Sequence, residues 1–338
     1  MAYQNVKNPR FYISWGDYWR SIGASIPPHN TIRPMETQSI TLEAGGDYYK
    51  FMDPHSYPPT DSAPKGINWY AVLNHNLTPG FEFIVKQYAN DGTNESFIVY
   101  DKAINIEGSE PGLMGFSLGT RSDAFTDMEQ EDVNIQTGIG TVSDSPVEAN
   151  ITFQIGCMVY GQYFDMPHSP DMSLTLTHSW GIKTTETKGG ASLSNAMWTK
   201  PPKWGDREAW QLGDFPYYYS GRRTWSLSFS EISDSDMEPY NYYGVLFDTD
   251  TGTPSVTRQN DPNWFQSVLY YTNGGQLPFI FNPDSSIEYY QNNEAEFEIN
   301  KTPRVPEFAI CKFDMNSFKR TQTSFNRYTI KIIIREVW

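Results

Sequence analysis

The sequence predicts an all-β protein with two β-sandwich or jelly-roll-like lobes, an extended N-terminal arm and long irregular loops. Charged residues are only 19% of the chain, and most of the remaining polarity comes from Ser, Thr, Asn, Gln and Gly. That mixture favours strands and turns over solvent-facing helices. Short apolar runs are separated by turn signals such as Pro79-Gly80 and Asn90-Asp91-Gly92. Aromatic residues reach 15%, which is enough large apolar surface to fill cores.

Prolines punctuate residues 1–35, which we therefore expect to form the extended arm. Within it, Phe11, Trp15 and Trp19 recur at helical spacing. This spacing predicts a short amphipathic helix between Phe11 and Ile22, docked on this chain or on a neighbour.

Residues 36–165 are expected to form the first lobe, a jelly-roll-like β-sandwich. Its strand-like runs are Ser39–Glu43, Tyr70–Leu73, Phe81–Tyr88, Phe97–Ile106, Val133–Thr137 and Ile151–Tyr160. Many short strands with Gly and Pro turns between them, and no clear helix, are typical of a sandwich.

Residues 166–338 are expected to form a second β-rich lobe. A strand is plausible at Ser173–His178, and Thr224–Ser230 alternates large apolar with small polar residues at a period of two. The last segment, Tyr328–Trp338, places its isoleucines on one face. We expect so apolar a strand to be sealed in a sheet, at an edge within the chain or between subunits.

A long aromatic loop is expected at residues 189–220 of the second lobe. A stretch so rich in Trp and Tyr is expected to lie over a partner surface. The candidate interface residues, in this loop and in the arm, are Trp15, Trp19, Trp198, Trp204, Trp210, Tyr217, Tyr218 and Tyr219. The alternative is that these side chains cover the core of their own chain.

The net charge of the chain bears on nucleic-acid partners. A net charge of −15 repels phosphate backbones, so no nucleic-acid partner is expected.

Cys157 and Cys311 lie in apolar runs and are expected to be buried free thiols. No apolar stretch approaches a membrane span and no leader opens the sequence, so we expect no membrane partner and assembly in a reducing cytoplasm.

Gly115-Phe116-Ser117-Leu118-Gly119 matches the pattern of the hydrolase nucleophile elbow. That motif needs a strand before the serine and a helix after it, within a parallel sheet. The residues after Gly119 lack helical apolar spacing, so we interpret the segment as an ordinary strand with small residues.

Two further patterns resemble metal sites only in part. Asp165, His168 and Asp171 are three residues apart, but the intervening prolines exclude a helix that would gather them. Asp248–Gly252 begins like a calcium loop without the later bidentate glutamate. With paired carboxylates for glycoside cleavage also disfavoured, we expect no enzyme activity, no cofactor and no bound metal.

Two sets of segments resemble structural proteins of tailed-bacteriophage virions. The first runs Trp69-Tyr70-Ala71-Val72-Leu73-Asn74-His75-Asn76-Leu77, with Gly115-Phe116-Ser117 and Ile155-Gly156-Cys157, and resembles the jelly-roll module related to discoidin domains. The second runs Gly221-Arg222-Arg223-Thr224-Trp225-Ser226-Leu227-Ser228-Phe229, with Leu277–Phe281 and Phe308–Phe313, and resembles the β-lobe of tail-tip and distal-tail proteins. The matching segments cover the smaller part of the chain.

The resemblance implies a non-catalytic structural component of a bacteriophage virion, assembled in the host cytoplasm. It would be a tail or tail-tip protein or a head accessory protein, and its partners would be other virion proteins and copies of itself. The alternative is a glycan-binding adhesion module of the virion, whose partner would be a host surface glycan.

Overall fold

The computed structural model is built almost wholly of β-strands, which confirms the predicted all-β class. It describes residues 8–33, 38–45, 48–50, 69–73, 81–90, 96–105, 116–120, 133–141, 150–172, 174–198, 203–204, 207–208, 221–237, 246–247, 254–255, 265–283 and 309–337. The helices among them are short: α1 (Trp15–Ser21), η1 (Pro28–Asn30), α2 (Asp234–Met237) and α3 (Phe265–Tyr271).

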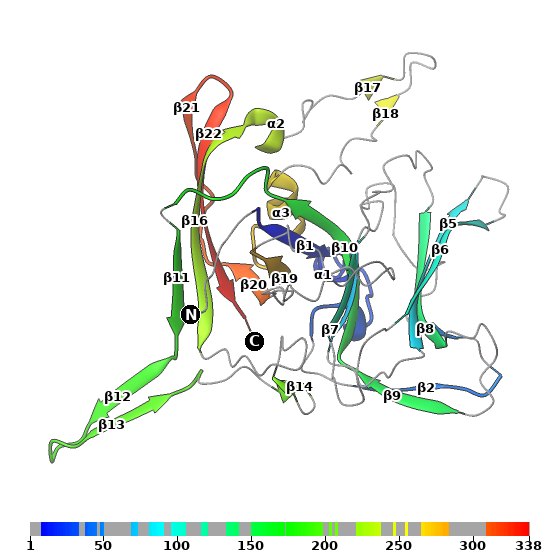
Figure 1. The fold of residues 1–338 in the computed structure, drawn as a ribbon, viewed down its shortest axis with the longest axis horizontal. Helices are drawn as coiled ribbons and strands as arrows, with labels where there is room; N and C mark the ends of the chain where they lie inside the picture. The colour runs from blue at the N-terminus through cyan, green and yellow to red at the C-terminus, as the bar shows by residue number, and fades with distance from the viewer. Residues whose placement is uncertain are drawn as a thin grey trace, which may run out of the picture.

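A ten-stranded sheet forms the centre of the fold (Figure 1). In spatial order its strands are β11 (Thr175–Ser179), β16 (Arg222–Ser233), β22 (Arg327–Glu336), β20 (Ala309–Phe313), β19 (Phe279–Asn282), β1 (Arg10–Ser14), β10 (Cys157–Asp165), β4 (Trp69–Leu73) and β7 (Phe116–Thr120), with β21 (Arg320–Ser324) paired to β22. Every pairing in it is antiparallel.

Smaller antiparallel sheets surround the central one. The two-stranded sheets are β2 (Gln38–Leu42) with β9 (Ile151–Ile155), β12 (Ile182–Glu186) with β13 (Ser192–Ala196), β14 (Lys203–Trp204) with β15 (Arg207–Glu208), and β17 (Leu246–Phe247) with β18 (Pro254–Ser255). A four-stranded sheet orders β3 (Tyr48–Lys50), β8 (Val133–Thr141), β5 (Phe81–Asn90) and β6 (Ser96–Asn105).

Gly156 divides one predicted strand between two sheets. The run Ile151–Tyr160 forms β9, which pairs with β2, and then β10, which enters the central sheet beside β1 and β4. The Gly156 amide donates a hydrogen bond to the Leu73 carbonyl at 3.1 Å. Because this contact lies between the two strands, the chain changes sheets without leaving the amide unpaired.

The N-terminal segment is not a separate arm, which corrects the sequence prediction. Its strand β1 pairs with β10 on one side and β19 on the other, and all five of its residues are buried. Ser14 then caps α1 by accepting a hydrogen bond from the Asp17 amide at 3.2 Å. The predicted helical run is therefore a central strand followed by a short helix.

The two predicted lobes share one sheet. β4, β7 and β10 come from residues 36–165, whereas the strands on the other side of β1 come from residues 166–338. The division placed at residue 165 falls at the end of β10, so it separates strands that are paired through β1. All five residues of β1 are buried, as suits this central position, where neither face of the strand meets water.

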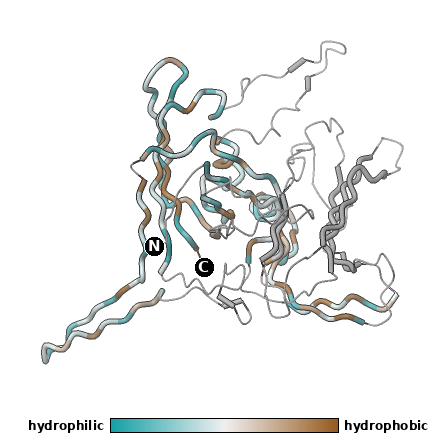
Figure 2. The backbone as a smooth tube through the Cα atoms, viewed as in Figure 1, coloured by the Kyte–Doolittle hydropathy of each residue, from teal (hydrophilic) through white to brown (hydrophobic). Residues whose placement is uncertain are grey.

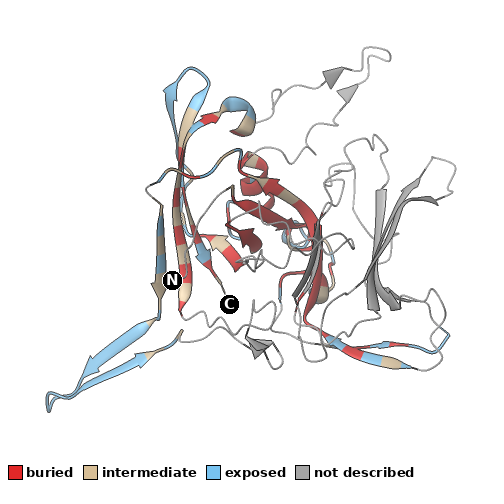
Figure 3. Cartoon of the chain, viewed as in Figure 1, coloured by how far each residue is buried: buried red, intermediate tan, exposed pale blue. Residues whose placement is uncertain are grey.

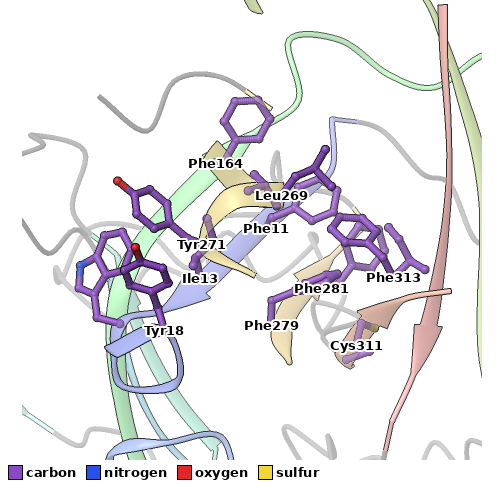
Figure 4. Packing of buried hydrophobic residues seen from close by; sticks show 14 of the residues in the cluster. Phe11, Ile13, Tyr18, Phe164, Leu269, Tyr271, Phe279, Phe281, Cys311 and Phe313 are labelled. Atoms are coloured by element: carbon purple, nitrogen blue, oxygen red, sulfur yellow. The ribbon is translucent and has the colours of Figure 1, made fainter. Parts of the chain in front are cut away.

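The central sheet is buried on both faces around β1, where side chains alternate between two clusters. On one face, Phe11 lies 5.6 Å from the ring of Phe279 and 5.4 Å from that of Phe281 (centroid to centroid), next to Leu269 of α3 (Figure 4). On the other face, Tyr12 contacts Trp69 edge-on at 5.4 Å. β1 therefore joins the two halves of the core.

Gly161 allows β4, β10 and β1 to lie close together. It is paired with Trp69 on one side and Ser14 on the other. A Cβ atom at this position would lie 1.9 Å from the Ile13 carbonyl oxygen, which also accepts a hydrogen bond from the Trp69 indole at 3.1 Å. A larger residue at position 161 would displace the backbone contact.

Candidate interaction surface

The β12–β13 hairpin projects from the end of the central sheet into solvent (Figure 3). All five residues of β12 and four of the five in β13 are exposed. The two strands pair with each other and with no other described strand. An isolated two-stranded hairpin is marginally stable in water, and each strand here has one open edge of backbone donors and acceptors.

Local sequence explains why this ribbon forms. Thr184 and Ser194 are directly opposed, and their hydroxyl oxygens lie 3.2 Å apart. At the turn, the Ala191 amide donates to the Thr187 hydroxyl at 3.0 Å, and Gly190 adopts a left-handed φ of +81° that favours glycine. Short polar and β-branched strands around a glycine turn are typical of a hairpin.

Large apolar side chains are exposed on both faces of the ribbon and at its base. Ile182 is 62% exposed and is paired with Ala196, whereas Leu193 is 61% exposed and is paired with Thr185. Because side chains alternate along a strand, Ile182 and Leu193 lie on opposite faces. Figure 2 shows hydrophobic stretches among hydrophilic ones along the hairpin. Water therefore meets aliphatic surface on either face.

The base of the hairpin is fixed by an aromatic contact. Trp198 packs over Gly181, where a Cβ atom would lie 2.9 Å from the indole ring, and Gly181 has a φ of +60°. The Trp198 amide donates to the Trp180 carbonyl at 2.9 Å. The guanidinium of Arg222, at the start of β16, lies 4.4 Å from the Trp198 ring centroid. The ribbon is thus joined to the central sheet through side chains as well as the backbone.

The structure places the predicted interface residues in different environments. Trp15 and Trp19 are fully buried in the protein's own core, which corrects their assignment to a contact surface. Their rings pack against Tyr271 and Tyr160, respectively. Trp198 is half-buried at the base of the hairpin. Trp204 lies in β14 without a described side chain, and Trp210, Tyr217, Tyr218 and Tyr219 lie outside the described residues.

This hairpin is not predicted from the sequence, because the expected long aromatic loop starts at residue 189. Gly189-Gly190 instead lies in the turn between β12 and β13. The run from Ile182 to Thr185 before it was the available signal, since β-branched residues flanking a glycine turn favour a hairpin.

The three residues considered as metal ligands each have a different role. The Asp165 carboxylate pairs with Arg10 at 2.6 Å, and His168 Nδ1 lies 2.7 Å from the Ser169 carbonyl oxygen. Asp171 accepts a hydrogen bond from the Ser230 hydroxyl at 2.8 Å. Within the described ranges, no group of three or more His, Cys, Asp or Glu side chains is placed to hold a metal ion.

The other motifs have simple structural settings. Ser117 lies inside β7, opposite Val72 of the antiparallel strand β4, so this serine occupies an ordinary strand position. The calcium-like Asp248–Gly252 segment lies outside the described residues, between β17 and β18. No helix in the described part of the chain is long and apolar enough to cross a bilayer.

Comparison with known proteins found no match to this chain among family models, curated proteins or solved structures.

Proposed function

We propose that this chain is a structural component of a bacteriophage virion, a tail or tail-tip protein or a head accessory protein, that acts by protein–protein assembly. The observation that supports assembly is the β12–β13 hairpin, which is exposed on both faces and whose outer edges pair with no other described strand. The virion context comes from the resemblance of the Trp69–Leu77 and Gly221–Phe229 segments to phage structural proteins.

The edges of the hairpin differ in how well they are protected. Proteins that stay separate block strand edges with charges, prolines or bulges. β12 contains Lys183 and Glu186, whereas β13 has the sequence Ser-Leu-Ser-Asn-Ala, with no charge and no proline. A strand from another chain adds most readily to such an edge, because backbone hydrogen bonds provide the affinity. The β13 edge is therefore the expected contact.

Shortening the hairpin tests the proposal. Residues 183–195 are replaced by Asn-Gly, a sequence that favours a tight turn, in the otherwise complete chain. The native chain is expected to form ordered oligomers by sedimentation velocity and electron microscopy. The shortened chain is expected to lose these oligomers while its circular dichroism still shows a folded β-protein. A native chain that stays monomeric at high concentration, or a shortened chain that assembles equally well, would contradict assembly through this hairpin.

One observation favours glycan adhesion as a second candidate. Trp180, at the hairpin base, is 42% exposed and lies beside His178, with ring centroids 6.4 Å apart. An exposed indole is a suitable stacking surface for a sugar, because it combines a flat apolar body with a polar tip. Saturable binding on a glycan array that is lost in Trp180→Ala would support adhesion. An array without saturable binding would exclude the array's glycans as partners.

A further inference from the structure

The β21–β22 hairpin carries a positive charge that contrasts with the rest of the chain. Residues 319–331 contain Lys319, Arg320, Arg327 and Lys331 and no Asp or Glu. The whole chain has a net charge of −15, so the residues outside this segment carry −19. All four cationic residues are exposed. The positive charge is therefore accessible at the surface of an acidic protein.

An exposed aromatic side chain lies at the tip of this hairpin. Phe325 is 87% exposed, next to Asn326, whose φ of +54° closes the turn. The hairpin is held to β16, because the Arg327 guanidinium donates to the Glu231 carbonyl at 3.2 Å. Phe325 is absent from the buried clusters of the core, so its side chain is available to another surface.

The positive charge continues from the tip along the outer face of the sheet. Arg327, Lys331 and Arg335 lie on the face of β22 opposite its buried isoleucines, all three exposed. Arg335 is directly opposite Lys312 of β20. Like charges directly across a ladder are destabilising, and the Asp314 carboxylate lies 3.9 Å from the Arg335 guanidinium. Folding alone gives no reason for this arrangement of cations.

We propose that the basic β21–β22 tip, with Phe325 at its end, docks on an acidic surface of a second copy of this chain. The proposal rests on the assembly function above and adds a second contact to it. Charge complementarity supports this occupant, because a copy presents a net −19 outside its own tip. The tip projects from the sheet at the end opposite β12–β13 (Figure 1), so one copy can contact two neighbours, as in a head-to-tail ring.

Charge reversal tests the contact. The complete chain with Lys319→Glu and Lys331→Glu is compared with a control carrying Arg20→Glu and Arg33→Glu, which changes the net charge equally at two exposed sites outside both hairpins. The tip variant is expected to self-associate more weakly at low salt, by about tenfold or more, and with a smaller salt dependence. The control is expected to behave as the native chain. Sedimentation velocity at two salt concentrations measures the strength of self-association and its salt dependence. Phe325→Ser tests whether the exposed aromatic ring contributes to the contact.

The possible results separate this contact from assembly itself. A tip variant that associates as tightly as the native chain overturns the docking proposal and leaves assembly through β12–β13 in place. Binding of heparin or anionic vesicles through the tip, with unchanged self-association, also overturns it, because the acidic partner would then be another polymer or a lipid. A native chain that is monomeric at low salt overturns both proposals.

Crosslinking identifies the partner surface directly. Thr323→Cys places a thiol on the exposed hairpin, while the two native thiols are buried. The variant is labelled with a benzophenone maleimide and mixed with isotope-labelled native chain. The expected product is a crosslink between copies to a peptide rich in Asp and Glu. Crosslinks confined to single chains would contradict the contact.

Discussion

Arg223 and Glu336 form a buried, bidentate ion pair between neighbouring strands of the central sheet. Arg223 Nη2 lies 2.9 Å from Glu336 Oε1, and Arg223 Nε lies 3.0 Å from Oε2. The Arg223 amide donates to the same Oε2 at 3.0 Å. The side chains are 0% and 3% exposed, respectively. The pair joins the start of β16 to the end of β22, close to where the β12–β13 hairpin leaves the sheet.

Breaking this pair is expected to destabilise the fold strongly. Arg223→Met leaves the Glu336 carboxylate buried without its cation, which costs about 3–5 kcal/mol of the free energy of unfolding. The double variant Arg223→Met with Glu336→Leu is expected to recover much of the loss, because no uncompensated charge remains. Urea unfolding followed by circular dichroism measures both. A double variant as unstable as the single one would contradict this account.

Trp19→Ala is expected to lower the free energy of unfolding by about 3–5 kcal/mol, because it opens a cavity in the core. Trp19 is fully buried against Tyr160, at 6.2 Å between ring centroids. The effect is expected at concentrations where the chain is monomeric. Unchanged monomer stability together with weaker association would instead place this indole at an interface between chains.

The two cysteines are expected to be unreactive in the folded chain. Cys157 and Cys311 are both fully buried. Burial raises the pKa of the Cys157 thiol to about 12, and burial together with the Glu336 carboxylate raises the pKa of Cys311 well above its ordinary value. Maleimide labelling followed by mass spectrometry should modify neither residue in native buffer and both in denaturant. Rapid labelling of either one in the native state would contradict the packing described.

Asp17 is expected to make stability depend on pH. Burial raises the pKa of this carboxyl group to about 6, although the Ile32 amide donates to it at 2.9 Å. The folded pKa of Asp17 lies above the unfolded value. The contribution of Asp17 to the free energy of unfolding is therefore fully present at pH below about 4 and is lost as pH rises to about 6.

Asp17→Asn removes this titration, so the stability difference between the variant and the native chain should shift in favour of the variant between pH 4.5 and pH 7. Unfolding free energies at the two pH values measure the shift. The control is Asp314→Asn, at an exposed site with its carboxylate near Arg335. A pH-independent difference for Asp17→Asn would contradict the raised pKa.

Regular alternation predicted the strands that have one face in the core. In β16, Trp225, Leu227 and Phe229 face inward while small polar residues face outward, and the burial pattern follows the sequence. The isoleucines of β22 behave in the same way. Each of these strands could be identified locally, because one face is apolar and the other meets water.

The segments that were missed lack this local signal. β1 is buried on both faces and each face carries an aromatic residue, so its period of two is hidden, and Phe11, Trp15 and Trp19 match a helix equally well. α3 has only seven residues, Phe265–Tyr271, and depends on packing against the core aromatics. β12–β13 has no buried face at all, so hydrophobic periodicity could not reveal it.

The most direct test of the central claim compares two aliphatic residues of similar exposure. Leu193 on β13 is 61% exposed, and Ile22 after α1 is 57% exposed. Leu193→Lys is expected to weaken self-association by about tenfold or more, because it places a charge in the contact, whereas Ile22→Lys should associate like the native chain in sedimentation equilibrium. Equal association by both variants and the native chain would contradict assembly through the hairpin.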